Sequence, residues 1–140
     1  MAIRLSEIVE ALELLSDDME YVYDVVDQNI LLVWDGMVDG EYNPQLYKEI
    51  MEDWDERYLF LPGRHEMNEY GMMEDFIESV TSDRKREILS NAIGGRGAFR
   101  RFKDTVRDLN LDDDWHRYRI HCLENIAKRW CEKNEIEYEQ

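Results

Sequence analysis

Cysteine, histidine and long apolar runs are scarce in this 140-residue sequence, and each scarcity excludes a class of protein. The two cysteines, Cys122 and Cys131, lie nine residues apart in a segment with helical periodicity. Positions nine apart face opposite sides of a helix, so the two thiols cannot pair with each other. A small secreted fold held together by disulfides is therefore excluded.

The sequence also lacks any apolar run near 18 residues, any CxxC pair and any secretory leader with a basic start. We therefore expect a cytoplasmic protein with no membrane partner. Three histidines and two cysteines yield no Ser/His/Asp or Cys/His grouping, and no phosphate-binding or dinucleotide-binding glycine pattern occurs. The sequence predicts no catalytic residue, no metal site and no cofactor, which favours a non-enzymatic protein.

Negative charge is abundant, and its distribution along the chain is uneven. The formal net charge is −16. Residues 1–80 contain 21 acidic and 4 basic residues, whereas residues 81–140 contain 12 acidic and 13 basic residues. Within residues 84–107, eight basic residues accompany only Glu87 and Asp104, which gives this window a charge of +6. A basic surface is therefore expected in the second half of an acidic protein.

The length and the 44% hydrophobic content predict one α+β domain over residues 1–140. It comprises an amino-terminal helix and hairpin in residues 1–62, a helical part in residues 63–136 and a tail in residues 137–140. We expect a small antiparallel sheet of about three strands, covered by about five helices. We also expect the chain from residue 135 onward to be disordered.

The expected strands and helices follow from periodicity and turn chemistry. The strands are residues 21–26, 30–34 and 57–61. The expected helices start near residues 3, 44, 64, 82, 97 and 112, where capping residues, prolines or glycines accompany an apolar period. Asn43, Ser82 and Asp112 are expected to cap three of them, and one helix is expected over residues 64–80. Aromatic side chains on the last two helices should be buried, namely Phe99, Phe102, Trp115 and Trp130.

The helix after the glycines is the candidate functional element, and its basic residues form the candidate anion-binding site. Arg96, Arg100, Lys103 and Arg107 step by four, three and four, which places them in one stripe about 16 Å long, with Arg101 beside it. Glycines before a helix can present backbone N–H groups to an anion. The partner could be a nucleic acid, a nucleotide or an acidic protein.

A structural explanation of the same residues is equally consistent with the sequence. Asp104 could pair with Arg100 or Arg101, and the glycines could form an ordinary turn between helices. The remaining arginines could neutralise the acidic first half. The net charge of −16 also opposes unaided DNA binding, although salt screens this repulsion beyond about 8 Å.

Other candidate sites are weaker. His65 and Glu69 are one helical turn apart and could share a metal, but the second histidine of an HExxH motif is missing. His116 and His121 diverge by about 140° around a helix. An enzyme site would have to use acidic residues near the hairpin, namely Asp24, Glu66 and Glu69. Of these, Asp24 interrupts a strand and is expected to be exposed. An acidic docking surface could instead be formed by Glu52, Asp53, Asp55 and Glu56.

Several segments of the second half resemble one protein family. They are FLP at residues 60–62, HEMNEY at 65–70, MEDFI at 73–77 and GGRGAFRRFKD at 94–104, followed by Trp115, Tyr118, Arg119, Trp130, Cys131 and Asn134. Together they resemble the bacterial group called Uncharacterised Protein Family 0158, over about residues 58–136. The resemblance implies an intact bacterial domain and supplies neither an activity nor catalytic residues.

Overall fold

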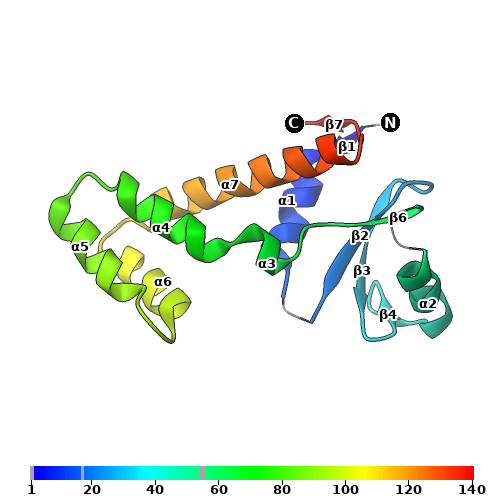
Figure 1. The fold of residues 1–140 in the computed structure, drawn as a ribbon, viewed down its shortest axis with the longest axis horizontal. Coiled ribbons are helices and arrows are strands. Elements are labelled where there is room, and N and C mark those ends of the chain that lie inside the picture. Colours follow the sequence, from blue (N-terminus) through cyan, green and yellow to red (C-terminus); the bar gives the residue numbers. More distant parts are fainter. Residues whose placement is uncertain (1, 17, 54–55) are drawn as a thin grey trace. The chain divides into compact units, whose positions relative to one another are not determined.

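The computed structural model describes residues 2–16, 18–53 and 56–140 (Figure 1). The chain divides into two compact units. We call Met1–Met67 with Leu123–Gln140 the sheet unit, and Asn68–Cys122 the helical unit. The long helix α7 (Asp112–Lys133) contributes residues to both. The expectation of one domain stays a prediction, and the two units are described separately below.

The sheet unit contains a five-stranded antiparallel sheet, so the α+β class is confirmed. Its strands are β2 (Glu20–Asp24), β3 (Asn29–Trp34), β4 (Met37–Val38), β5 (Glu41–Tyr42) and β6 (Tyr58–Phe60), in the order β5-β4-β3-β2-β6. The predicted hairpin is present, with Tyr23 opposite Ile30, and the predicted third strand lies beside β2. The expectation of about three strands was wrong because β4 and β5 are two-residue strands, too short to show an alternating pattern.

Two helices of the sheet unit follow local signals in the sequence. α1 (Leu5–Leu14) buries Ile8 and Leu12 completely or almost completely. α2 (Pro44–Glu52) starts as predicted, since Asn43 Oδ1 accepts a hydrogen bond from Leu46 N at 3.1 Å. Ile50 of α2 belongs to the core cluster formed with the sheet. Trp54 and Asp55, which the sequence assigns to the end of this helix and its acidic run, lie outside the described residues.

The two ends of the chain pair with each other, which corrects the expectation of a disordered tail. β1 (Ile3–Arg4) pairs in parallel with β7 (Tyr138–Glu139). Ile3 N donates to Glu137 O at 3.0 Å, and Ile3 itself is buried. Within the carboxyl-terminal part of α7, Trp130 is buried as expected and donates from Nε1 to Phe60 O at 2.9 Å.

The helical unit consists of α4 (Glu69–Ser79), α5 (Asp83–Ala92), α6 (Ala98–Asp108) and the first half of α7. The continuous helix expected over residues 64–80 is divided into α3 (Arg64–Met67) and α4. The division falls at Asn68, whose φ of 51° is left-handed and whose Oδ1 accepts from Gly71 N at 3.2 Å. Ser82 caps α5 as predicted, accepting from Lys85 N.

An aromatic cluster forms the core of the helical unit. Phe102 is fully buried. The centroid of its ring lies 4.7 Å from the ring centroid of Trp115 and 6.2 Å from that of Phe76, and both pairs have edge-to-face geometry. The ring centroids of Tyr118 and Phe76 are 5.6 Å apart, so Tyr118 belongs to the same cluster. The predicted burial of Phe102 and Trp115 is thus confirmed. Within the described residues, none of the helices is both long and apolar enough to cross a membrane.

Phe99 was expected in this core, but its side chain is 41% exposed. The buried side of α6 consists of Ala98, Phe102 and Val106, which recur every four residues. Phe99 lies one position later than Ala98, about 100° around the helix, and therefore falls at the boundary of the buried side.

Candidate anion-binding surface

The α6 helix exposes a row of cations because its apolar residues fix which side faces the core. With Ala98, Phe102 and Val106 buried, the basic residues turn outward, and Arg96, Arg100, Lys103 and Arg107 are all exposed. We call these four residues the basic surface. The helix begins after Gly97, and Gly95 and Gly97 have left-handed φ angles of 75° and 73°. No acidic residue occupies the first turn of α6, so the positive end of its dipole keeps its field.

The cations of the basic surface differ in their partners. The side chains of Arg96, Arg100 and Lys103 form no hydrogen bond or ion pair with any residue that the structure describes. Arg107 Nη2 lies 3.3 Å from Asp104 Oδ1, and both side chains are more than half exposed. Such an exposed pair within one helix is worth about 0.3–0.5 kcal/mol and can be exchanged for another anion. The pairing of Asp104 with Arg100 or Arg101, considered from the sequence, is not present; Asp104 pairs with Arg107 instead.

Arg101 has a different environment, although the sequence groups it with the other cations. Its Nε donates to Ala92 O at 2.9 Å, and its two terminal nitrogens donate to the carbonyls of Gly94 and Arg96. The carbonyl of Ala92 belongs to the last residue of α5, and those of Gly94 and Arg96 follow it, in a region where backbone acceptors lack helical partners. Arg101 therefore fixes the turn between α5 and α6, and with it the backbone that carries Arg96.

We expect Arg101→Lys to lower the free energy of unfolding by about 1 kcal/mol, because the single ammonium group of lysine cannot replace the three hydrogen bonds that the planar guanidinium donates to carbonyls. Arg100→Lys, which makes the same chemical change at a cation without described partners, should leave stability within about 0.5 kcal/mol. Urea unfolding followed by helical circular dichroism measures both. Equal losses in the two variants would contradict the role of Arg101 in the turn.

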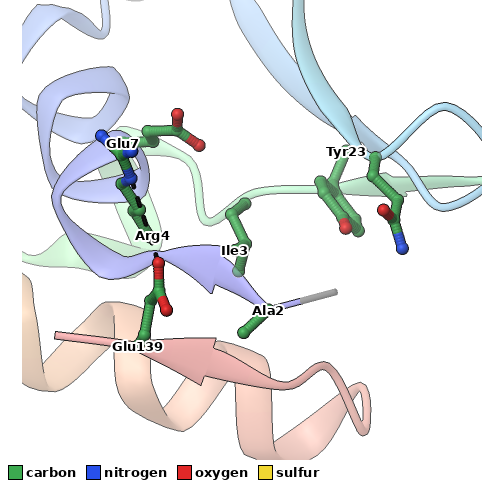
Figure 2. Close-up of a pocket in the computed structure, with 7 residues that line it drawn as sticks. Ala2, Ile3, Arg4, Glu7, Tyr23 and Glu139 are labelled. Atoms are coloured by element: carbon green, nitrogen blue, oxygen red, sulfur yellow. Dashed lines mark ion pairs between the residues drawn. The ribbon is translucent and has the colours of Figure 1, made fainter.

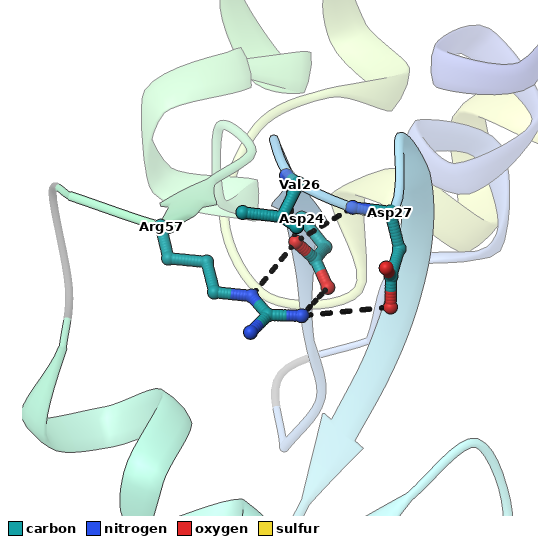
Figure 3. A network of polar contacts seen from close by, with 4 residues as sticks. All are labelled: Asp24, Val26, Asp27 and Arg57. Atoms are coloured by element: carbon teal, nitrogen blue, oxygen red, sulfur yellow. Dashed lines mark hydrogen bonds and ion pairs between the residues drawn. The ribbon is translucent and has the colours of Figure 1, made fainter.

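Asp24 was expected to be exposed, and this was wrong: its side chain is buried, with the residue 2% exposed. Figure 3 shows the guanidinium of Arg57 facing the carboxylates of Asp24 and Asp27. Arg57 Nε and Nη2 donate to the two oxygens of Asp24, each at 3.0 Å. The backbone N–H groups of Val26 and Asp27 donate to Oδ1 at 2.9 and 3.2 Å.

The electrostatics of Asp24 are those of a structural carboxylate. Burial acts to raise its pKa, but the hydrogen bonds from Arg57 and from the two backbone N–H groups outweigh burial and lower it. A general acid at neutral pH needs the opposite shift. The position of Asp24 at the end of β2 thus serves to join the hairpin turn to Arg57, just before β6.

The other acidic residues of the enzyme hypothesis are also engaged. Glu69 Oε1 lies 2.6 Å from Arg119 Nη2, and both side chains are mostly buried. Glu66 Oε1 accepts from Gly63 N at 3.4 Å. His65 and Glu69 do not share a helix, since α3 ends at Met67. Among the described residues, no group of three or more histidine, cysteine, aspartate or glutamate side chains could hold a metal ion.

The sheet unit has a cavity of about 510 Å³ next to β1 (Figure 2). Its lining is mixed: Ala2 and Ile3 are apolar, while Glu7 and the exposed pair of Arg4 Nε with Glu139 Oε1, 3.9 Å apart, are charged. Among the residues that the structure describes, those predicted as site residues do not line this cavity, and the described lining includes no cysteine, histidine or serine.

The cations of the basic surface are exposed at the positions that the sequence suggests, but two features beside them were not predicted. The exposure of Phe99 was missed because a phenylalanine at helical spacing is usually assigned to the core. The turn-fixing role of Arg101 was missed because backbone carbonyls leave no signature in a sequence. A partial signal existed for Phe99, since Ala98, Phe102 and Val106 recur every four residues without it.

Comparison with known proteins gives a family without an assigned activity. The family model described as "Uncharacterised protein family (UPF0158)" matches residues 1–140. The chain is similar to the UPF0158 protein PA5073 of Pseudomonas aeruginosa, with 27% identity over 138 residues, which cover 98% of this chain and 86% of the relative. No solved structure matches the chain.

Proposed function

The chain belongs to the uncharacterised protein family UPF0158, and we propose from its geometry that it is a non-enzymatic binding or adaptor domain whose basic surface on α6 holds an anionic partner. The observation that carries the proposal is the exposure of Arg96, Arg100 and Lys103 without partners among the described residues. Because no described carboxylate occupies these three side chains, they are available to an external anion without the loss of an internal ion pair.

The division of charge between the two units supports this proposal. The sheet unit has 22 acidic and 7 basic residues, a formal charge of −15, whereas the helical unit has 11 acidic and 10 basic residues, a formal charge of −1. The helical unit is therefore close to neutral overall, with its cations concentrated in residues 84–107. Repulsion from the acidic unit is screened over about 8 Å at physiological salt.

Preorganisation of the surface also favours binding. The core residues of α6 hold the helix in one orientation, and Arg101 holds the turn before it through three backbone carbonyls. An anion placed near the start of α6 would meet the positive end of the helix dipole and the guanidinium groups of Arg96 and Arg100. One guanidinium group can donate two parallel hydrogen bonds to a phosphate or a carboxylate, which suits a polyanion.

The test is a titration of the protein with inorganic polyphosphate at low salt. The triple variant Arg96→Gln, Arg100→Gln, Lys103→Gln removes three cations of the basic surface and should weaken binding at least about 10-fold, because each lost cation removes a phosphate contact and the counterion release that goes with it. The matched control Lys48→Gln, Arg129→Gln, Lys133→Gln removes three exposed cations of the sheet unit. If the control weakens binding as much as the triple variant, or if the wild-type protein does not bind, the proposal is wrong.

A further inference from the structure

We propose that the anionic partner is single-stranded nucleic acid, with Phe99 providing a stacking surface for a base next to the cations that hold its phosphates. This inference rests on the proposed function and specifies the partner of the same surface. Its structural basis is that the Phe99 ring lies outside the core of the helical unit.

Phe99 is an exception within its own helix. α6 exposes one large apolar side chain, and its other apolar residues, Ala98, Phe102 and Val106, are buried. The 41% exposure of Phe99 contrasts with 0% for Phe102, three residues later. An exposed phenyl ring gains nothing from water, whereas a partner that covers its face gains the free energy of burying it. The exposed ring is therefore available to a partner with an apolar or aromatic surface.

The place of Phe99 on the helix joins it to the basic surface. Phe99, Lys103 and Arg107 are four residues apart in succession, so they lie in one row that turns by about 40° at each step. This row is about 12 Å long, close to the length of three stacked nucleotides at about 3.4 Å each. Arg100 follows Phe99 directly and lies three residues before Lys103, on the outer side of the row. The ring thus has cations on the side that faces away from the core.

An exposed aromatic ring beside a row of cations distinguishes among the anionic partners considered from the sequence. Inorganic phosphate or an acidic peptide would use the cations and leave the ring without a matching flat surface. A DNA or RNA duplex stacks its bases internally and exposes only their edges and the backbone. A single strand offers both phosphates and free base faces, which proteins bind with a basic groove or row and aromatic stacking. Single-stranded nucleic acid therefore fits both features of α6.

The experiment compares two probes with the same number of phosphates. One is an oligothymidine of about 16 nucleotides, at the upper end of the lengths covered by one small binding fold. The other is the corresponding abasic oligonucleotide, which keeps the sugar-phosphate chain and lacks the bases. Fluorescence anisotropy at low salt should give about 5- to 100-fold tighter binding of the oligothymidine, because only this probe can stack on Phe99.

Variants then assign the difference to the ring. Phe99→Ala should bring the two affinities together by weakening oligothymidine binding, while leaving the abasic probe unchanged. Phe99→Tyr should retain most of the preference. Ile88→Ala removes another exposed apolar side chain of the helical unit and should change neither affinity. Thermal melting by circular dichroism confirms that each variant is folded.

The outcomes separate this inference from the proposed function. Equal binding of the two probes by the wild-type protein, or a preference that survives Phe99→Ala, would overturn base stacking and leave the anion-binding function intact. Tighter binding of a duplex or of polyglutamate than of oligothymidine would overturn the choice of a single strand in favour of those partners. Absence of binding to every one of these polyanions at low salt would overturn the proposed function itself.

Discussion

Phe102→Ala is expected to lower the free energy of unfolding by about 3 to 5 kcal/mol, a large share of the roughly 5 to 15 kcal/mol that stabilises a typical domain. Phe102 is fully buried between Phe76 and Trp115, and removal of its ring leaves a cavity that these two aromatic side chains cannot fill. Urea unfolding followed by circular dichroism at a helical wavelength measures the loss.

Phe99→Ala is the matched control, because it makes the same chemical change on the same helix at an exposed position. Its cost should stay within about 1 kcal/mol. Similar losses for the two variants would show that the assignment of Phe102 to the core and Phe99 to the surface is wrong, and would remove the basis for a binding role of Phe99.

Asp24→Ala is expected to cost about 2 to 4 kcal/mol at neutral pH. Removing one partner of a fully buried ion pair lowers the free energy of unfolding by roughly 3 to 5 kcal/mol. We expect a smaller loss for this pair because the Arg57 side chain is 40% exposed. The variant leaves the backbone N–H groups of Val26 and Asp27 without their side-chain acceptor, and it leaves Arg57 with only the exposed carboxylate of Asp27. Asp27→Ala removes the exposed carboxylate that lies 3.5 Å from the same guanidinium and should cost less than about 1 kcal/mol.

The contribution of Asp24 should also depend on pH. Its pKa is lowered in the folded protein, so the unfolded chain binds the proton more readily. The stabilisation is therefore present above the unfolded-state pKa of about 3.9 and is lost as the pH falls through the lower pKa of the folded state. The gap between wild type and Asp24→Ala in urea midpoints should shrink on acidification from pH 7 to about pH 3. A gap that stays constant or widens would contradict the pairing with Arg57.

Local signals in the sequence were sufficient for much of the fold. Asn43 and Ser82 cap the helices they were expected to cap, and the hairpin of β2 and β3 forms around the predicted turn. These features depend on neighbouring residues alone. The pairing of Ile3 with Tyr138 joins opposite ends of the chain, and no local pattern predicts it. The break at Asn68 was hidden because the apolar period continues through it on both sides.

The candidate site was predicted in its composition but not in its detail. The basic stripe is exposed because the charge pattern and the helical period agree over residues 96–107. The phase of the buried side was ambiguous, since Phe102 and Val106 belong equally to a stripe that starts at Ala98 or at Phe99. The larger apolar side chain of Phe99 suggests that it is the buried residue. Ala98 is buried instead, because its small side chain allows α6 to pack closely against the core. Asp24 was misplaced because its partner, Arg57, lies 33 residues away.

The central claim, that the cations of α6 bind a polyanion, is tested most directly by the salt dependence of oligothymidine binding. Three to four phosphate contacts predict that the logarithm of the association constant falls with the logarithm of salt concentration with a slope of about −2 to −3. The variant Arg96→Gln, Arg100→Gln, Lys103→Gln removes three of these contacts and should leave a slope between about 0 and −0.7, while the control variant in the sheet unit keeps the wild-type slope. A wild-type slope near zero, or a slope that the triple variant leaves unchanged, would contradict the claim.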